Sequence, residues 1–281
     1  MLRRPFFGFA VYLLRTGDAA RLAEWYAGVL GLPIVRGREP TFYLSLGDVF
    51  ILELLADKGA PGEAPQGLRL VLASLDLAAT RARLSERGAR VLADEAGHVI
   101  ARDPDGNTVA IRQFGSPRSS FLPGCSPPAK DLSGVCAVQR LCAQPRAVAA
   151  FFAELFGQPD SETGAVRLGN GISLEFAPGG HAAAPPTARE AARHCFIVRT
   201  GDHDVAVEAV RRHCQTPVET NLAFNSAVLS YFADPEGQLW GVDERFEPAR
   251  FKTPRRPFAE DMEILRRLRS RKDGICQQST L

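Results

Sequence analysis

Two stretches decide the fold: LAEWYAGVLGLP, residues 22–33, and VAAFFAELFGQP, residues 148–159, align without a gap although they lie far apart in the chain. In each stretch an aromatic pair lies one helical turn from other apolar residues, which predicts a short amphipathic helix packed on a sheet. Gly31 and Gly157 follow the last apolar residues, where glycine commonly ends a helix in the left-handed conformation. The chain therefore contains an internal repeat.

A second pair of matching stretches marks the end of each repeat. RDPDGNTVAIRQF, residues 102–114, matches ADPEGQLWGVDERF, residues 233–246. Both contain Asp-Pro-acidic-Gly, a turn in which proline presets φ and glycine accepts a positive φ between two strands. A third repeated motif is RTGD, which lies between a strand and a helix at both places and makes Asp18 and Asp202 candidate helix N-caps.

Each repeat divides into two modules with the order strand, helix and three short strands. In the first repeat we expect a strand over 9–14, a helix over 19–30, the strands TFYLSLG, VFILELLA and LRLVLAS, a helix over 77–87, and strands near 90–92, 98–102 and 108–113. The second repeat follows the same scheme. The predicted organisation is a first domain over 5–114, a Pro/Ser/Gly-rich linker over 115–134, a second domain over 135–247, and a C-terminal basic helix and tail over 248–281.

The composition fits two globular domains. Of the 281 residues, 45% are apolar and 23% are charged, which suffices to fill two cores. The 34 basic and 32 acidic residues are spread along the chain and leave a net charge of +2, so we expect no nucleic-acid partner. The six cysteines lack metal-binding spacing and are interpreted as reduced thiols. No apolar stretch is long enough to span a membrane, and we expect a cytoplasmic protein.

The combination of strand, aromatic helix ending in glycine, and DPDGN turn resembles the vicinal oxygen chelate superfamily, which includes glyoxalase I, extradiol dioxygenases, fosfomycin-modifying enzymes and bleomycin-resistance proteins. The resemblance runs from Phe6 to Phe246. It implies an α+β fold of tandem glyoxalase-like domains, each with two βαβββ modules forming a curved mixed sheet around a cleft. In the catalytic families that cleft holds a divalent metal through His, Glu or Gln on the first and last strands of the paired modules.

In the first domain the resemblance places the four ligand positions on Ala10 or Val11, Glu53, Leu68 or Arg69, and Ala110. One ligand in four does not hold a metal. Arg69 or Arg112 could instead pair with Glu53, in an arrangement that holds a ligand carboxylate or neutralises a buried charge.

In the second domain the same positions fall on Cys136 or Val138, Glu175, His194 and Gly241. Asp243 lies two residues beyond Gly241, on the same face of the strand because side chains alternate. Glu175, His194 and Asp243 could therefore form a triad of one imidazole and two carboxylates that binds Fe, Zn, Mn or Ni. The alternatives are that His194 is a hydrogen-bonded core residue and that Asp243 belongs to a solvated cluster with its charged neighbours.

Three functions stay open. The first, which the visible loss of ligands favours, is a metal-independent binder that sequesters a small molecule. The second is a metal-dependent lyase or isomerase, or an extradiol-type dioxygenase, with its active site in the second domain. The third is metal-free catalysis with His194 or Glu175 as general base. The partner in each case is a small molecule, and the chain is a monomer with pseudo-dimeric domains or a homodimer.

Overall fold

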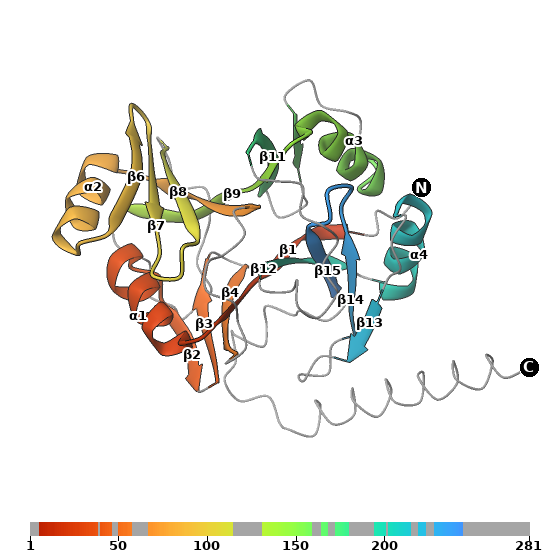
Figure 1. Cartoon of the computed structure of the whole chain (residues 1–281), viewed down its shortest axis with the longest axis horizontal. Coiled ribbons are helices and arrows are strands. Elements are labelled where there is room, and N and C mark those ends of the chain that lie inside the picture. Colours follow the sequence, from red (N-terminus) through yellow and green to blue (C-terminus); the bar gives the residue numbers. More distant parts are fainter. Residues whose placement is uncertain are drawn as a thin grey trace, which may run out of the picture.

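A computed structural model of the chain describes residues 6–38, 40–46, 50–57, 67–114, 131–158, 164–167, 172–179, 194–200, 202–214, 219–222 and 228–243. In the first half of the chain, the elements are β1 (Phe6–Thr16), α1 (Ala19–Leu30), β2 (Ile34–Arg38), β3 (Thr41–Ser45), β4 (Ile51–Ala56), β5 (Leu68–Ser74), α2 (Leu77–Glu86), β6 (Arg90–Glu95), β7 (His98–Arg102) and β8 (Thr108–Gln113). In the second half they are β9 (Leu132–Cys142), α3 (Pro145–Leu155), β10 (Ala165–Arg167), β11 (Ser173–Pro178), β12 (His194–Thr200), α4 (His203–His213), β13 (Glu219–Leu222), β14 (Val228–Ala233) and β15 (Leu239–Asp243). Figure 1 shows their arrangement.

The predicted helix ends are confirmed. The side chains of Asp18 and Asp202 accept hydrogen bonds from the backbone three residues on, at the starts of α1 and α4. Gly31 and Gly157 have φ values of 68° and 61° after α1 and α3, the conformation that favours glycine. β9 begins at Leu132, inside the stretch 115–134 that the sequence interpretation assigns to a linker.

The strands form two mixed sheets, which confirms the α+β class. The eight-stranded sheet has the order β13-β14-β15-β12-β1-β4-β3-β2, and the seven-stranded sheet has the order β10-β11-β9-β5-β8-β7-β6. Within them β1 runs parallel to β4 and antiparallel to β12, and β5 runs parallel to β8 and antiparallel to β9. The third module shows two strands after its helix in the described residues, whereas the other three modules show three.

The modules do not pair within each sequence repeat, which differs from the expected pairing of the first module with the second and of the third with the fourth. The first module (β1–β4) joins the fourth (β12–β15), and the second (β5–β8) joins the third (β9–β11). Each joint is an antiparallel pair between the first strands of two modules. All four first strands are apolar in a similar way, so the local pattern does not determine which two meet. Both sheets therefore combine both halves of the chain.

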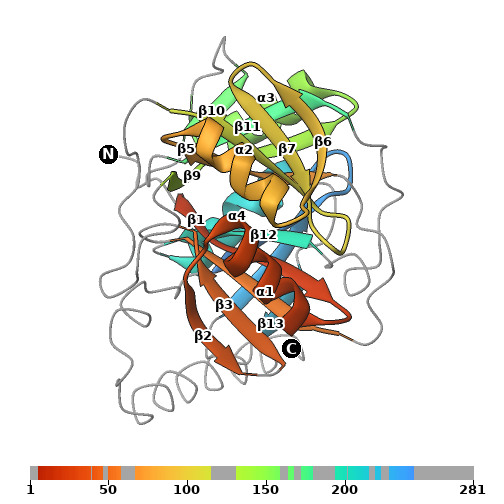
Figure 2. The ribbon, with the colours of Figure 1, turned by 90° about the vertical axis from the view of Figure 1, so that its left-hand side faces the viewer.

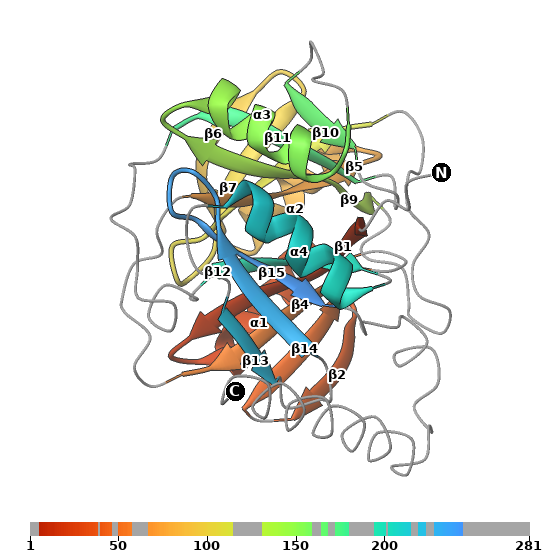
Figure 3. The ribbon, with the colours of Figure 1, turned by 90° about the vertical axis from the view of Figure 1, so that its right-hand side faces the viewer.

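One central core holds the sheets together. Buried residues of both sheets and of all four helices form a single apolar cluster, among them Tyr12, Tyr26, Phe152 and Trp240. The helices meet in pairs, α1 with α2 and α3 with α4, on opposite sides of the molecule (Figures 2 and 3). Each sheet also has a smaller apolar cluster on its other face. We call that side the helix-free face of the sheet.

The predicted basic helix near residues 258–271 lies outside the described residues. In the part of the chain that the structure describes, no helix has the length and apolar character needed to cross a membrane.

Candidate functional site

The helix-free face of the seven-stranded sheet carries an arginine–carboxylate pair. Arg112 of β8 donates from both terminal nitrogens to the two carboxylate oxygens of Glu175 of β11, each at 2.7 Å. Two strands, β9 and β5, lie between these residues in the sheet, so the side chains reach across the face. This hydrogen bonding outweighs burial and raises the pKa of Arg112. Such bidentate pairs are the strongest ion pairs that side chains make.

A row of polar side chains runs beside this pair. The register places Glu175 opposite Gln139, Gln139 opposite Arg69, and Arg69 next to Thr108. Arg69 donates to the Gln139 side chain and to the Thr108 hydroxyl, both at 3.1 Å. Burial and the nearby Arg112 lower the pKa of Arg69. Neither arginine pairs with Glu53, contrary to expectation, because Glu53 belongs to the other sheet.

The helix-free face of the eight-stranded sheet centres on Glu53. The register sets Tyr43, Glu53, Leu13 and Cys195 side by side on strands β3, β4, β1 and β12. The Tyr43 hydroxyl donates a long hydrogen bond, 3.4 Å, to Glu53. Burial raises the pKa of Glu53 to about 7, although Tyr43 and Arg15 act in the opposite direction. A carboxyl group that is part protonated at neutral pH can both donate and accept hydrogen bonds.

The surroundings of Glu53 are largely apolar. Ala10, Val11, Leu13, Cys195 and Ile197 form the cluster on this face, and Leu55 and Tyr231 pack against it. Burial raises the pKa of the Cys195 thiol far above its ordinary value. The face thus combines an apolar wall with the Glu53 carboxyl group and two phenols, and Asp243 lies near enough to raise the pKa of Glu53.

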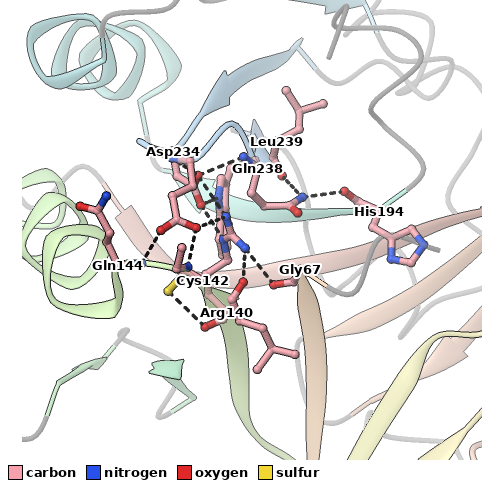
Figure 4. Close-up of polar contacts among 12 residues, drawn as sticks. Gly67, Arg140, Cys142, Gln144, His194, Asp234, Gln238 and Leu239 are labelled. Carbon is pink, nitrogen blue, oxygen red and sulfur yellow. Dashed lines mark hydrogen bonds and ion pairs between the residues drawn. The ribbon is translucent and has the colours of Figure 1, made fainter. Parts of the chain in front are cut away.

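The structure does not bring Glu175, His194 and Asp243 together. Glu175 lies in the seven-stranded sheet, whereas the other two lie in the eight-stranded sheet. His194 pairs with Leu14, whose side chain is in the central core, and its ring lies 6.4 Å from the ring of Tyr12, also in that core. The side chain of Asp243 points to the helix-free face, because its strand neighbour Val242 points into the central core and side chains alternate along a strand. In Figure 4 the His194 ring points away from the polar network, and its backbone carbonyl accepts from Gln238 at 3.1 Å.

The residues at the ligand positions do not fit a divalent metal. On the eight-stranded sheet, the helix-free face presents Val11, Glu53, Cys195 and Gly241 there; on the seven-stranded sheet it presents Cys136, Glu175, Arg69 and Ala110. Glu53 and Cys195 both have raised pKa values, and metal ligation needs the deprotonated forms. Glu175 is already bound to a guanidinium. Among the described residues, no three His, Cys, Asp or Glu side chains gather as a metal would require.

A buried network joins the two sheets. Arg140 of β9 donates from Nε to Asp234 at 2.8 Å, and the two side chains are 4% and 0% exposed (Figure 4). Asp234 also accepts from the Trp240 indole at 3.3 Å. Arg140 also donates to the backbone carbonyl of Gly67 at 3.3 Å. A Cβ atom at Gly67 would lie 2.8 Å from the Gln238 side chain, which would then have to move. The turn between β14 and β15 of the fourth module is thereby fixed to β9 of the third module.

The same kind of turn makes an equivalent contact in the other half. Asp103 accepts from the Tyr26 hydroxyl at 3.1 Å, so the turn of the second module is fixed to α1 of the first. Each Asp-Pro-acidic-Gly turn therefore connects modules that belong to different sheets.

Several residues of the site were missed by the sequence interpretation. Tyr43 and Tyr231 were not singled out, and Cys195 was passed over for its neighbour His194. The sequence did contain a signal for Cys195. Phe196 and Val198 are core residues, so alternation along the strand places His194 on the core face and Cys195 on the opposite face. Tyr43 could have been found from the alternation of TFYLS, but its partner Glu53 is fixed by the antiparallel register.

Comparisons with known proteins agree with this geometry. Residues 11–112 match the family model described as a glyoxalase-like domain. Glyoxalase I from Zea mays has a TM-score of 0.60 and 14% identity, with 84% of this chain and 92% of that chain covered. A Bacillus subtilis protein provisionally titled a dioxygenase has a TM-score of 0.58 and 19% identity, with 86% of each chain covered. No curated protein sequence matches the chain. The chain therefore has a glyoxalase-like fold, and residues 11–112 match the glyoxalase-like domain model, in agreement with the resemblance to the vicinal oxygen chelate superfamily.

Proposed function

We propose that this protein binds a small organic molecule without a metal, on the helix-free face of the eight-stranded sheet around Glu53. The observation that carries the proposal is that both helix-free faces lack the metal-ligating side chains expected there. The remaining carboxylate on the seven-stranded sheet, Glu175, is hydrogen-bonded to Arg112 at 2.7 Å. A guanidinium in bidentate contact supplies the positive charge that a metal would otherwise bring to that carboxylate. The Arg112–Glu175 pair on the helix-free face of the seven-stranded sheet then has a structural role. The helix-free face of the eight-stranded sheet is left to bind a ligand.

The chemistry around Glu53 defines the ligand class. The walls are apolar, which favours a compound with an apolar body. Glu53 near its pKa of about 7 and the phenol of Tyr43 suit one neutral oxygen of the ligand, such as a carbonyl or phenol oxygen. A carboxylate ligand beside Glu53 is disfavoured, because Asp243 already raises the pKa of Glu53 and a further negative charge would act in the same direction.

The metal part of the proposal is tested by elemental analysis. The purified protein is incubated with zinc, nickel, manganese or ferrous salts, desalted and analysed. We expect far less than one metal per chain, and the same content in Glu53→Gln. One equivalent of any metal that disappears in Glu53→Gln would refute the proposal.

The ligand part is tested by pH. A panel of uncharged phenols and hydroxyketones is screened by thermal shift, and any binder is titrated on either side of neutrality. Binding through protonated Glu53 weakens as the pH rises through about 7. Glu53→Gln removes that dependence, and Glu95→Gln, at an exposed strand position, leaves it unchanged. Wild-type binding that is independent of pH would contradict the assignment of Glu53.

A second candidate function is metal-free acid–base catalysis by the same carboxyl group. The pKa of about 7 favours it, because a group that exchanges protons near neutrality is an efficient general acid or base. Incubation of an α-hydroxyketone with the protein in deuterated water, followed by NMR, separates the two. Exchange at the α-carbon that Glu53→Gln abolishes supports catalysis, and binding without exchange supports a pure binder. The general bases predicted from sequence, His194 and Glu175, do not face this site.

A further inference from the structure

A separate cavity of about 490 Å³ lies where α1, the segment after α2, and the turn before β8 meet. It is on neither helix-free face. Its lining includes Trp25 and four arginines, Arg21, Arg87, Arg90 and Arg102. A concentration of guanidinium groups around one concave surface is typical of a site for an anion.

The charges of the lining are not balanced locally. Arg21 pairs with Asp105 at 2.6 Å. Among the described residues, Arg87, Arg90 and Arg102 form no ion pair, and the buried Nε atom of Arg102 has no hydrogen-bond partner. A buried donor without a partner costs free energy that an incoming acceptor can recover.

The acidic groups of the lining are occupied by the fold itself. Asp103 accepts hydrogen bonds from Tyr26, from the Asn107 side chain at 2.6 Å and from two backbone amides. Asp105 is engaged with Arg21. The cavity therefore keeps an excess of positive charge.

The internal repeat shows that the fold does not need two of these arginines, Arg21 and Arg102. The equivalent of α1 is α3, where Ala147 replaces Arg21 and Phe151 replaces Trp25. Before the second Asp-Pro-acidic-Gly turn, Ala233 replaces Arg102. The same helix and turn are built in both halves, and these two arginines are present in one.

Trp25 gives the cavity an aromatic wall. Its indole is half-buried, and its position is fixed by an edge-on contact with Tyr26, with ring centroids 5.0 Å apart and planes at 86°. Its face can stack on a planar ring while the arginines hold an anionic group. We propose that this cavity binds a phosphate monoester carried by an aromatic or heteroaromatic ring. The proposal does not depend on the function assigned to Glu53.

Intrinsic fluorescence provides the test, because the chain has two tryptophans and Trp240 is fully buried. Phenyl phosphate is titrated into the full chain, with phenol and inorganic phosphate as comparison compounds. We expect saturable quenching by phenyl phosphate in the micromolar to low millimolar range, weaker binding of inorganic phosphate, and none of phenol. Trp25→Phe removes the quenching, and calorimetry still detects weakened binding.

Arginine variants decide whether the cavity is the site. Arg87→Ser and Arg90→Ser replace exposed side chains, so folding is preserved, and each is expected to weaken binding about tenfold. Arg211→Ser, an exposed arginine on α4 at the other side of the molecule, is the matched control and leaves binding unchanged. Absence of saturable quenching, equal binding of phenol, or equal affinities in the Arg87, Arg90 and Arg211 variants would each overturn the proposal.

Discussion

The substitution Glu53→Gln should change how stability depends on pH. The folded-state pKa of Glu53, about 7, lies above its ordinary value of 4.5 because of burial. Between these two values the folded protein holds a proton that the unfolded chain has released, so the free energy of unfolding falls as the pH rises. Moving the pKa from 4.5 to about 7 corresponds to about 3 kcal/mol, which is an upper value for a partly exposed group. The stabilisation is complete below the unfolded pKa and is lost once the pH passes the folded one.

Urea denaturation of both proteins at a series of pH values measures the effect. Glutamine has no proton to lose, so Glu53→Gln should gain up to about 3 kcal/mol relative to wild type between about pH 4.5 and about pH 8. Burial also raises the pKa of Asp103, to about 6, but that contribution is present in both proteins and cancels in the difference. Glu24→Gln, at an exposed position on α1, should give a constant difference. A constant difference for Glu53→Gln would refute the buried, protonated carboxyl group.

Two further predictions follow from buried groups. Asp234→Ala removes the nearer carboxylate of buried Arg140 and leaves Glu236 at 3.6 Å, so it should lower the free energy of unfolding by about 3 kcal/mol in urea denaturation. Arg81→Ala removes the exposed pair with Asp94 and should cost less than about 1 kcal/mol; equal losses in the two variants would contradict the burial argument. Burial raises the pKa of the Cys195 thiol, so peptide mass spectrometry should find it unmodified by iodoacetamide in the folded protein and modified after unfolding. Rapid labelling in the folded state would contradict the burial of the Cys195 thiol.

Local structure could be predicted from the sequence because local rules determine it. The helix over 19–30 was predicted at its observed bounds, since its apolar period, its Asp18 cap and Gly31 agree. The Asp-Pro-acidic-Gly turns were found for the same reason. The start of β9 inside the predicted linker was missed, because Pro, Ser and Gly upstream obscure where the strand begins.

The candidate site could be predicted only in part. Glu53, Arg69, Arg112 and Glu175 do lie on helix-free faces, as alternation along single strands implies. Their partners could not be predicted, because the Arg112–Glu175 contact depends on the curvature of a sheet and on two intervening strands. His194 was assigned by its residue type, whereas alternation along β12 directs it to the core.

The exchange of modules between sheets changes how the loss of metal ligands is understood. The two halves of the sequence suggested one degraded site over 5–114 and one partly preserved site over 135–247. In the structure each helix-free face takes one module from each half, so Leu13 lies beside Cys195, and Arg112 binds Glu175. The sites therefore have to be compared sheet by sheet. Each sheet retains one glutamate, and the two differ in their partner: a guanidinium neutralises Glu175, whereas burial among apolar groups raises the pKa of Glu53. That difference, rather than the order of the halves, is why we place ligand chemistry at Glu53.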